Sequence, residues 1–398
     1  MKPMLWAWLG VVLLLVGCVS REDNAMPRGP LAITYRVPAV PIAPQNAPQI
    51  RLSGFLQGHS GTVFQVAFSA DSQRYLTIGG DQRLIVWDMT SGEPLLQLER
   101  RAVQRAFFLP TEEAILTLDT ENHVRKWSLE TATEAVAPVF LQSNYRSAAL
   151  SPDGSHLAVG LENGVVRLFD TESLGLAAEV LAYTGGYPVL DLQFAPDGGA
   201  LYTLAELGVA HWTLAEDAAT TPVADRQEAP LGWASTPDHR WWAIVYANEV
   251  LVLDLLSGTE RNRFNLPITP GQPLALELSV DGNWLALGTG RLEAVLVFDV
   301  ASGSVVASLG GHEQAFRSLV LSPDRALLLT GLDRRSPFLW NLSSIAAGAA
   351  LADESQVPRA ALNLVPDLHL HALDWSPDGR YVVLRDERGP LYVLGIPQ

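Results

Sequence analysis

The chain of 398 residues contains one cysteine, Cys18, and only two lysines, Lys2 and Lys126. With a single cysteine, no disulfide can form within the chain. The shortage of basic residues has a wider consequence, because 27 Lys and Arg stand against 43 Asp and Glu and the formal net charge is −16. A surface of that sign repels other anions, so neither nucleic acid nor anionic lipid headgroups are expected as partners.

The N-terminus also lacks an apolar run long enough to span a bilayer comfortably. Its apolar stretch, Leu5 to Val16, follows the positive Met1-Lys2 and ends in Leu15-Val16-Gly17-Cys18, which resembles a bacterial lipobox. Residues 1–17 are therefore expected to be a lipoprotein signal peptide, with Cys18 as the lipidated first residue of the mature protein. The alternative is an ordinary signal peptide followed by an incidental cysteine.

The residues after Cys18 bear on where the protein resides. Lipoproteins retained at the inner membrane tend to carry Asp directly after the cysteine, whereas this chain has Val19 and Ser20. A lipid-anchored protein of the cell envelope is expected, on the periplasmic face of the outer membrane. Residues 18–49 are rich in proline and poor in large apolar residues, which predicts an extended tether, with plain disorder as the alternative.

A segment of about forty residues recurs eight times between residue 50 and the C-terminus. Each copy contains a turn such as Ser151-Pro152-Asp153-Gly154, in which Pro presets φ and Asp and Gly allow the chain to reverse. A later strand of each copy ends in Trp, Phe or Leu, at positions 87, 127, 169, 212, 253, 298, 340 and 394. The last interval alone is markedly longer, which predicts an insertion after Trp340.

The first copy, residues 57–88, opens on Gly58-His59 and closes on Trp87-Asp88, and in this it resembles the WD40 family. The resemblance implies an all-β fold, a β-propeller in which each copy supplies one four-stranded blade. Eight blades are expected over residues 50–398, with seven blades plus an irregular unit as the alternative. Too few residues follow Leu394 for a final strand, so the resemblance implies that Ile50 to Leu56 closes the ring.

The resemblance also assigns two structural tetrads of side chains. The first copy has His59, Thr77, Asp81 and Trp87, and the seventh has His312, Thr330, Asp333 and Trp340. A chain of hydrogen bonds through such residues would tie together the connections of a blade and has no catalytic role. The other copies lack the histidine and are expected to rely on packing.

Motifs for catalysis, metals or cofactors are poor. Gly288-Thr289-Gly290 lacks the third glycine of a dinucleotide fingerprint, and His369 and His371 share a strand face without a third ligand. Asp191, Glu277 and Asp374 fall on innermost strands and could line the central channel, but no pattern selects them. No enzymatic activity, metal or cofactor is expected.

In WD40 proteins the face that carries the Gly-His connections, here called the Gly-His face, is the usual binding platform. At the start of the innermost strands, the position of Phe64 is occupied in the other copies by Gln104, Arg146, Leu190, Leu231, Leu274, Arg317 and His371. Aromatic residues and arginine are enriched in binding hot spots, although they also pack well in strands. The candidates for partner binding are Phe64, Arg146, Arg317 and His371.

Connectivity predicts how such a ring would be oriented. The closing strand begins on the face opposite the Gly-His face, so the tether should leave from there. The insertion, with a possible short helix over residues 345–351 capped by Ser343 or Ser344, should lie on that same opposite face.

Two functions remain open. The first is a non-catalytic, membrane-tethered scaffold, a monomeric ring that binds protein partners at the cell envelope. The alternative is a propeller enzyme or small-ligand-binding protein that uses the central channel.

Overall fold

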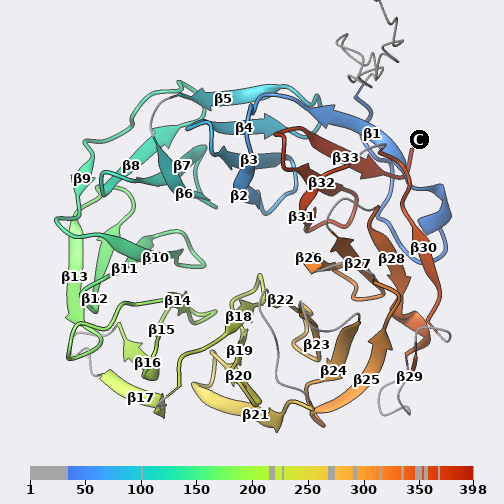
Figure 1. Ribbon diagram of the computed structural model, residues 1–398. Coiled ribbons are helices and arrows are strands. Elements are labelled where there is room, and N and C mark those ends of the chain that lie inside the picture. Colours follow the sequence, from blue (N-terminus) through green and yellow to red (C-terminus); the bar gives the residue numbers. More distant parts are fainter. Residues whose placement is uncertain are drawn as a thin grey trace, which may run out of the picture. The chain divides into compact units, whose positions relative to one another are not determined.

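A computed structural model describes residues 35–99, 102–214, 220–225, 228–267, 274–289, 294–312, 316–332, 336–345, 352–353, 357–365 and 368–397. Cys18, the predicted signal peptide and Asp333 lie outside these residues. Within them, the strands form eight sheets that follow one another around a ring (Figure 1). The prediction of an all-β propeller with eight blades is confirmed, and the alternative of seven blades is wrong.

The blades are numbered here along the chain, and their strands are given from the innermost to the outermost. Blades 1 to 4 are β2 (Val63–Phe68), β3 (Arg74–Gly79), β4 (Leu84–Asp88) and β5 (Pro94–Leu98); β6 (Val103–Phe108), β7 (Ala114–Asp119), β8 (His123–Ser128) and β9 (Val139–Phe140); β10 (Tyr145–Leu150), β11 (His156–Leu161), β12 (Val165–Asp170) and β13 (Leu176–Leu181); β14 (Asp191–Phe194), β15 (Ala200–Ala205), β16 (Gly208–Thr213) and β17 (Thr220–Asp225).

Blades 5 to 8 continue in the same order. They are β18 (Gly232–Ser235), β19 (Trp241–Val245), β20 (Glu249–Asp254) and β21 (Thr259–Asn265); β22 (Leu274–Leu278), β23 (Trp284–Thr289), β24 (Val295–Asp299) and β25 (Ser304–Leu309); β26 (Phe316–Leu321), β27 (Leu327–Leu332), β28 (Phe338–Asn341) and β30 (Arg359–Ala361); β31 (Leu370–Trp375), β32 (Val382–Asp386), β33 (Leu391–Gly395) and β1 (Arg51–Leu56).

In six of the eight blades the turn that follows the inner strand is shaped by a hydrogen bond from a Ser or Thr hydroxyl to an Asp. In blade 1 the Ser69 hydroxyl donates to Asp71 at 2.6 Å, and the same carboxylate accepts the backbone N–H of Gln73 at 3.0 Å. The Ser69 oxygen in turn accepts the N–H of Arg74 at 2.9 Å, where the second strand begins. Because these bonds lie within six residues, such a copy of the repeat can form its hairpin without help from the rest of the chain.

Neighbouring blades are held together by apolar side chains. Between blades 4 and 5, Tyr202 and Leu204 pack with Trp242 and Ile244, and all four are almost fully buried. Burial of one large apolar side chain contributes about 1.5–3 kcal/mol, so each interface between blades is a small core of its own.

The closing strand lies where connectivity placed it. β1 pairs antiparallel with β33, from Arg51 opposite Gly395 to Leu56 opposite Leu391. The first and last segments of the propeller therefore share one sheet, and blade 8 has no missing strand.

Residues 35–49, the last part of the predicted tether, differ from an extended free segment. They include a 3-10 helix, η1 (Ala47–Gln49), and the backbone N–H of Ala39 donates to Ile396 at 2.9 Å. Ile42 is 2% exposed within a core cluster that includes Leu394. The few apolar side chains of this segment find places against blade 8, which a composition dominated by proline did not reveal.

The insertion after Trp340 also shows an unexpected pairing. It joins a third to a fourth strand as predicted, through the 3-10 helix η2 (Leu342–Ser344), which Asn341 caps by accepting the N–H of Ser343. Its strand β29 (Ala352–Asp353) pairs in parallel with β25, the outer strand of blade 6. The insertion of blade 7 is thus attached to the neighbouring blade; residues 346–351 of the predicted helix lie outside the described residues.

Candidate functional site

The inner strands of the eight blades differ at one position. In five of them the pairing with the second strand shifts by one residue, and the extra residue of this β-bulge is Phe64, Gln104, Arg146, Arg317 or His371. These strands belong to blades 7, 8, 1, 2 and 3, which are consecutive around the ring and are called the five-blade arc. A bulge bends its strand and redirects a side chain, and such bulges are common beside functional sites.

The other three inner strands, in blades 4, 5 and 6, pair without a shift. They form the three-blade arc, and the corresponding positions are Leu190, Leu231 and Leu274. The sequence repeat aligns all eight positions, but it does not predict which of them form a β-bulge. Its only signal was the change from leucine to polar and aromatic residues.

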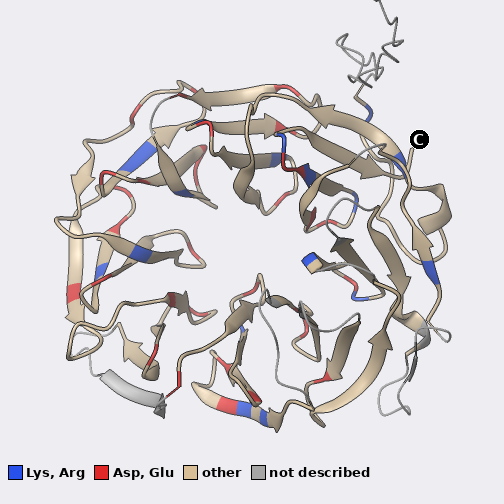
Figure 2. Ribbon diagram, in the orientation of Figure 1, with Lys and Arg blue, Asp and Glu red and all other residues tan. Residues whose placement is uncertain are grey.

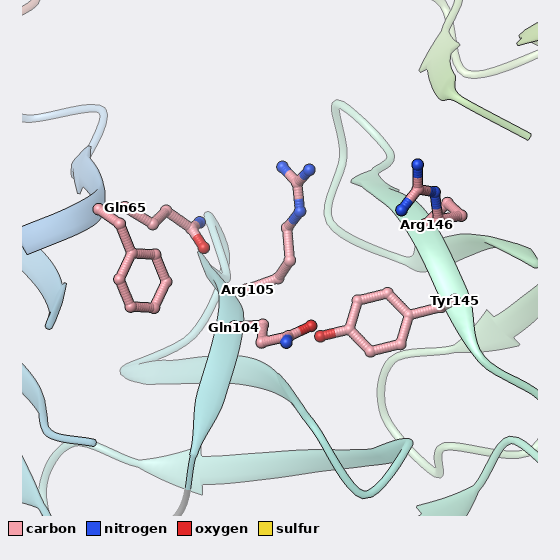
Figure 3. Close-up of a pocket in the computed structure, with 6 residues that line it drawn as sticks. Gln65, Gln104, Arg105, Tyr145 and Arg146 are labelled. Atoms are coloured by element: carbon pink, nitrogen blue, oxygen red, sulfur yellow. The ribbon is translucent and has the colours of Figure 1, made fainter. Parts of the chain in front are cut away.

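Within the five-blade arc, the channel mouth on the Gly-His face contains a cavity of about 450 Å³. It is lined by Phe64, Gln65, Gln104, Arg105, Tyr145 and Arg146 (Figure 3). The cavity spans the first residues of β2, β6 and β10, so three blades contribute to it. Two of the four predicted contact residues, Phe64 and Arg146, are brought together here.

Hydrogen bonds between blades hold two walls of this cavity in place. Gln65 Nε2 donates to the carbonyl of Ala106 in the next blade at 3.0 Å, and the Tyr145 hydroxyl donates to the carbonyl of Leu118 at 3.2 Å. Burial raises the pKa of Tyr145, so its hydroxyl stays protonated at neutral pH. Figure 3 shows the Arg105 guanidinium extending between Gln65 and Arg146.

The other two predicted contact residues lie in blades 7 and 8. Arg317 forms an ion pair with Glu387 at 3.7 Å. His371 is half-buried, and its pKa is lowered by burial and by the positive charge of Arg385, so the imidazole is neutral at pH 7. This part of the rim is thus partly neutralised by its own ion pair.

The three inner-strand carboxylates lie in three different blades, on β14, β22 and β31. Asp374 accepts the Tyr75 hydroxyl at 2.8 Å and pairs with Arg385 at 2.9 Å. Burial raises the pKa of Asp191 to about 6 and that of Glu277 to about 8, and the charge of Asp374 contributes to the second shift. Asp191 and Glu277 belong to blades 4 and 6, so both raised values fall in the three-blade arc.

Blade 1 brings the four predicted tetrad residues into one chain of hydrogen bonds. His59 contacts Asp81 through Nδ1 at 3.0 Å and Thr77 through Nε2 at 2.8 Å, and Trp87 Nε1 donates to Thr77 Oγ1 at 2.9 Å. Because Asp81 only accepts, the network assigns the His59 proton to Nδ1. Burial would raise the pKa of Asp81, but hydrogen bonds from His59 and Ser60 hold it below its ordinary value.

Parts of this network recur in other blades. In blade 7, His312 Nε2 lies 3.0 Å from Thr330 Oγ1, which also accepts from Trp340 at 3.1 Å; Asp333 lies outside the described residues. The prediction that most blades rely on packing has two exceptions among the blades without the histidine. Trp127 donates to Thr117 at 2.9 Å, and Trp212 donates to Thr203 at 3.3 Å. The Thr-to-Trp spacing of the first copy could have revealed the first of these pairs.

A second cavity, of about 570 Å³, lies at the other ends of the inner strands. Its lining combines alanine, phenylalanine and proline side chains with Gln193 and His239, and contains no charged residue. The two cavities therefore offer different chemistry, with arginine and amide groups at the Gly-His face and apolar groups at the opposite face.

The segments that match a known protein family are distributed unevenly between the two arcs of the ring. Residues 50–88, 142–170 and 303–341 match the family described as WD domain, G-beta repeat. The comparisons support a WD40 β-propeller. The inner strands in the three matched segments, β2, β10 and β26, all lie in the five-blade arc.

Three relatives illustrate the likeness in sequence. The chain is 26% identical over 309 residues to WD repeat-containing protein 90 of Xenopus tropicalis, covering 69% of this chain and 16% of that protein. It is 23% identical over 338 residues to human apoptotic protease-activating factor 1, covering 82% and 25%. With small ribosomal subunit protein RACK1y of Oryza sativa subsp. japonica it shares 29% over 137 residues, covering 33% and 41%. The chain thus spans less than half of each relative.

Two solved structures resemble the fold. The C-terminal WD40 domain of Sif2 superimposes with a TM-score of 0.66 at 11% identity, covering 88% of this chain and 99% of that one. The computationally designed Ika8 protein gives 0.65 at 19% identity, covering 86% and 98%. WD40 propellers generally mediate protein–protein interactions and are generally non-catalytic, so the family directs attention to surfaces.

The described residues also bear on metal binding and on membrane insertion. In that part of the chain no three or more His, Cys, Asp or Glu side chains are grouped as a metal site would require. None of its helices is long and apolar enough to cross a membrane.

Proposed function

We propose that this protein is a non-catalytic scaffold, tethered to the cell envelope, that binds protein partners with the rim of the five-blade arc on its Gly-His face. The observation that carries the proposal is the run of five consecutive bulged inner strands. Each bulge presents one extra side chain at the channel mouth, and none of the five is an aliphatic residue. A purely structural ring would have no need for this asymmetry.

The nature of the rim suits a protein partner. Phe64 is 47% exposed, and it stands beside the amide groups and arginines of the cavity. An exposed aromatic side chain surrounded by hydrogen-bonding groups is the usual composition of a binding hot spot. The cavity wall is already fixed by bonds between blades, so little ordering is needed when a partner binds.

The tether is proposed from the sequence. Leu15-Val16-Gly17-Cys18 supports acylation at Cys18, and the residues that follow support the periplasmic face of the outer membrane. The first described residue, Tyr35, donates its hydroxyl to the carbonyl of Met89, which follows the end of β4 on the face opposite Gly58-His59. A tether that leaves from there would direct the Gly-His face, and any partner on it, away from the membrane.

The binding proposal is tested by partner capture from solubilised envelope with a rim variant in which Phe64, Arg146, Arg317 and His371 are changed to Ala. The matched control changes Leu190 and Leu231 to Ala at the same positions of the three-blade arc. We expect the rim variant to lose stoichiometric partners and the control to keep them, with both proteins melting as cooperative units. Equal capture by the two proteins would exclude the rim.

Attachment is tested separately with Cys18→Ser. The variant should move to the soluble fraction or remain unprocessed, because two or more acyl chains are needed for stable anchoring. Unchanged processing and membrane association would contradict the lipoprotein assignment and leave the binding proposal intact.

The 570 Å³ cavity keeps a second function under consideration, a small-ligand-binding protein that uses the central channel. Its volume is within the range of ligand sites, and its uncharged lining favours an apolar ligand. Mass spectrometry of the purified protein under native conditions tests this function: a bound small molecule supports it, and a mass equal to that of the chain alone argues against it.

A further inference from the structure

Most arginines of this protein have a carboxylate partner. In the described part of the chain, ion pairs are formed by Arg74, Arg83, Arg125, Arg167, Arg240, Arg263, Arg317, Arg325, Arg380, Arg385 and Arg388. This is expected, since 43 acidic residues are available to 27 basic ones, and Figure 2 shows residues of both kinds around the ring. Arginines without such a partner are a minority of the described arginines.

Two of the exceptions line the same cavity. Arg105 and Arg146 form no ion pair with any described residue, and both are exposed. Arg105 follows the bulge of β6, and Arg146 is itself the bulge residue of β10, so the bulges help to place both guanidinium groups at the channel mouth. Asp191 is near enough for Arg105 to lower its pKa, but burial outweighs this effect and raises that pKa to about 6.

We propose that these two arginines form a seat for one carboxylate of a protein partner, an Asp or Glu side chain next to an apolar residue that packs on Phe64. The inference rests on the proposed function and names the chemistry of the partner. A guanidinium group donates in a planar fork that matches a carboxylate, and two of them on adjacent blades can share its two oxygens. Gln104, which Figure 3 shows between Arg105 and Tyr145, adds a neutral hydrogen-bonding group.

The net charge of the whole protein restricts the size of this anion. At −16, the molecule repels an extended polyanion over long distances. A single carboxylate on an otherwise neutral segment feels little of that repulsion and gains the two local contacts. The seat therefore favours one acidic residue in the partner segment over an acidic run.

The carboxylate seat is tested by selecting peptides that bind the full chain from a random twelve-residue library displayed on phage. The selected peptides are then synthesised and titrated by fluorescence anisotropy. We expect them to share an Asp or Glu beside an apolar residue. Changing that acid to its amide should weaken binding to the wild-type protein at least tenfold and leave the weak binding to Arg105→Ala/Arg146→Ala unchanged.

The matched control is Arg74→Ala/Arg263→Ala, which makes the same change in net charge at two exposed ion pairs outside the cavity. This variant should bind the peptides as the wild type does. A charge exchange provides the positive arm: Arg146→Glu should lose the acidic peptide and bind the version in which its Glu is replaced by Arg.

Three outcomes would overturn the inference. Peptides that lose affinity on Phe64→Ala but bind the double arginine variant normally would exclude the carboxylate seat and leave the proposed function standing. Peptides whose affinity is unchanged by every rim substitution would exclude the proposed function itself. Displacement of the peptide by micromolar succinate or phosphate would assign the seat to a small free anion.

Discussion

The five-blade arc and the three-blade arc are built from the same repeat, yet they place opposite chemistry in the central channel. The first adds one residue to each inner strand and presents Phe, Gln, Arg and His at the mouth. The second keeps regular pairing and carries Asp191 and Glu277, two carboxyl groups whose pKa burial raises. The difference suggests that binding and support are divided between consecutive blades of one ring.

The family matches agree with this division. The inner strands that lie in the matched repeats belong to blades 1, 3 and 7, all inside the five-blade arc. Blades 4 to 6 keep the fold with altered polar contacts. In blade 4 the Tyr183 hydroxyl lies 3.1 Å from Thr203 Oγ1, where blade 1 has a histidine.

The largest effect is expected from removal of the closing strand, which belongs to blade 8 of the five-blade arc. A chain that begins at Gly58 should lose on the order of 5 kcal/mol of stability relative to one that begins at Tyr35, because the apolar contacts of β1 are lost and the edge of β33 is exposed. Thermal unfolding of both chains measures this. A third chain beginning at Ile50 separates the contribution of residues 35–49, and equal melting of all three would contradict ring closure.

The next largest effect compares the polar networks of the two arcs. Trp87→Ala should destabilise the ring by about 3–5 kcal/mol, through lost burial and the loss of the hydrogen bond from Trp87 to Thr77. Trp212→Ala in blade 4 should also be destabilising, but by less, since its bond to Thr203 is longer. Urea unfolding of both variants provides the values. A larger effect in blade 4 would show that the three-blade arc depends more on its network.

Glu277→Gln tests the half-buried carboxyl of the three-blade arc through pH. The folded-state pKa of about 8 lies above the ordinary value of 4.5, so the folded protein binds more protons than the unfolded chain between these values. Stability should therefore fall as pH rises through that window, and the penalty is complete above pH 8. The variant should be more stable than the wild type at pH 9, by on the order of 2 kcal/mol, and similar at pH 4.

Chemical unfolding across that pH range measures the difference. Asp191→Asn is the companion variant, and its gain should be smaller and complete by about pH 7, because its pKa rises only to about 6. If the difference in stability between Glu277→Gln and the wild type does not change with pH, the pKa of Glu277 is the same in the folded and the unfolded protein. The proposed penalty on the charged carboxyl would then be wrong.

The smallest effect concerns the bulge itself. Deleting Gln104 should turn β6 into a regular inner strand like β14, with a stability loss of about 1 kcal/mol, because three blades of this ring already pair that way. Binding of the peptides selected on the rim should fall at least tenfold, as Arg105 is redirected. Gln104→Ala keeps the bulge and should bind within a few fold. Normal binding after the deletion would remove the bulge from the explanation.

The sequence predicted those features that depend on nearby residues. In six blades the turn after the inner strand is set by bonds such as Ser69 to Asp71, and each third strand ends one residue beyond its marked position. The closing strand followed from a simple count, since one blade lacked a fourth strand. The tetrad of blade 1 could be assigned because the spacing of His59, Thr77 and Trp87 survives in full.

The features that escaped prediction depend on a second element. A bulge is defined by the pairing of two strands, so Phe64 and Arg146 were selected as rim residues without the geometry that presents them. β29 pairs with a strand of another blade, and Ile42 is buried by partners far along the chain. The lack of an ion pair at Arg105 and Arg146 within the described residues is likewise a property of the assembled ring.

The pairing of β1 with β33 also has a consequence for how the protein is made. Arg51 is among the first propeller residues to be synthesised and Gly395 is among the last, so the closing sheet forms only when nearly the whole chain is present. Contacts so distant in sequence form slowly, and a strand edge that waits for its partner is open to wrong pairing. In a nascent chain the earlier blades can form in order, while the seam in blade 8 of the five-blade arc stays open until the end. The surface proposed for binding would therefore be completed last, and an unfinished ring would not present it whole.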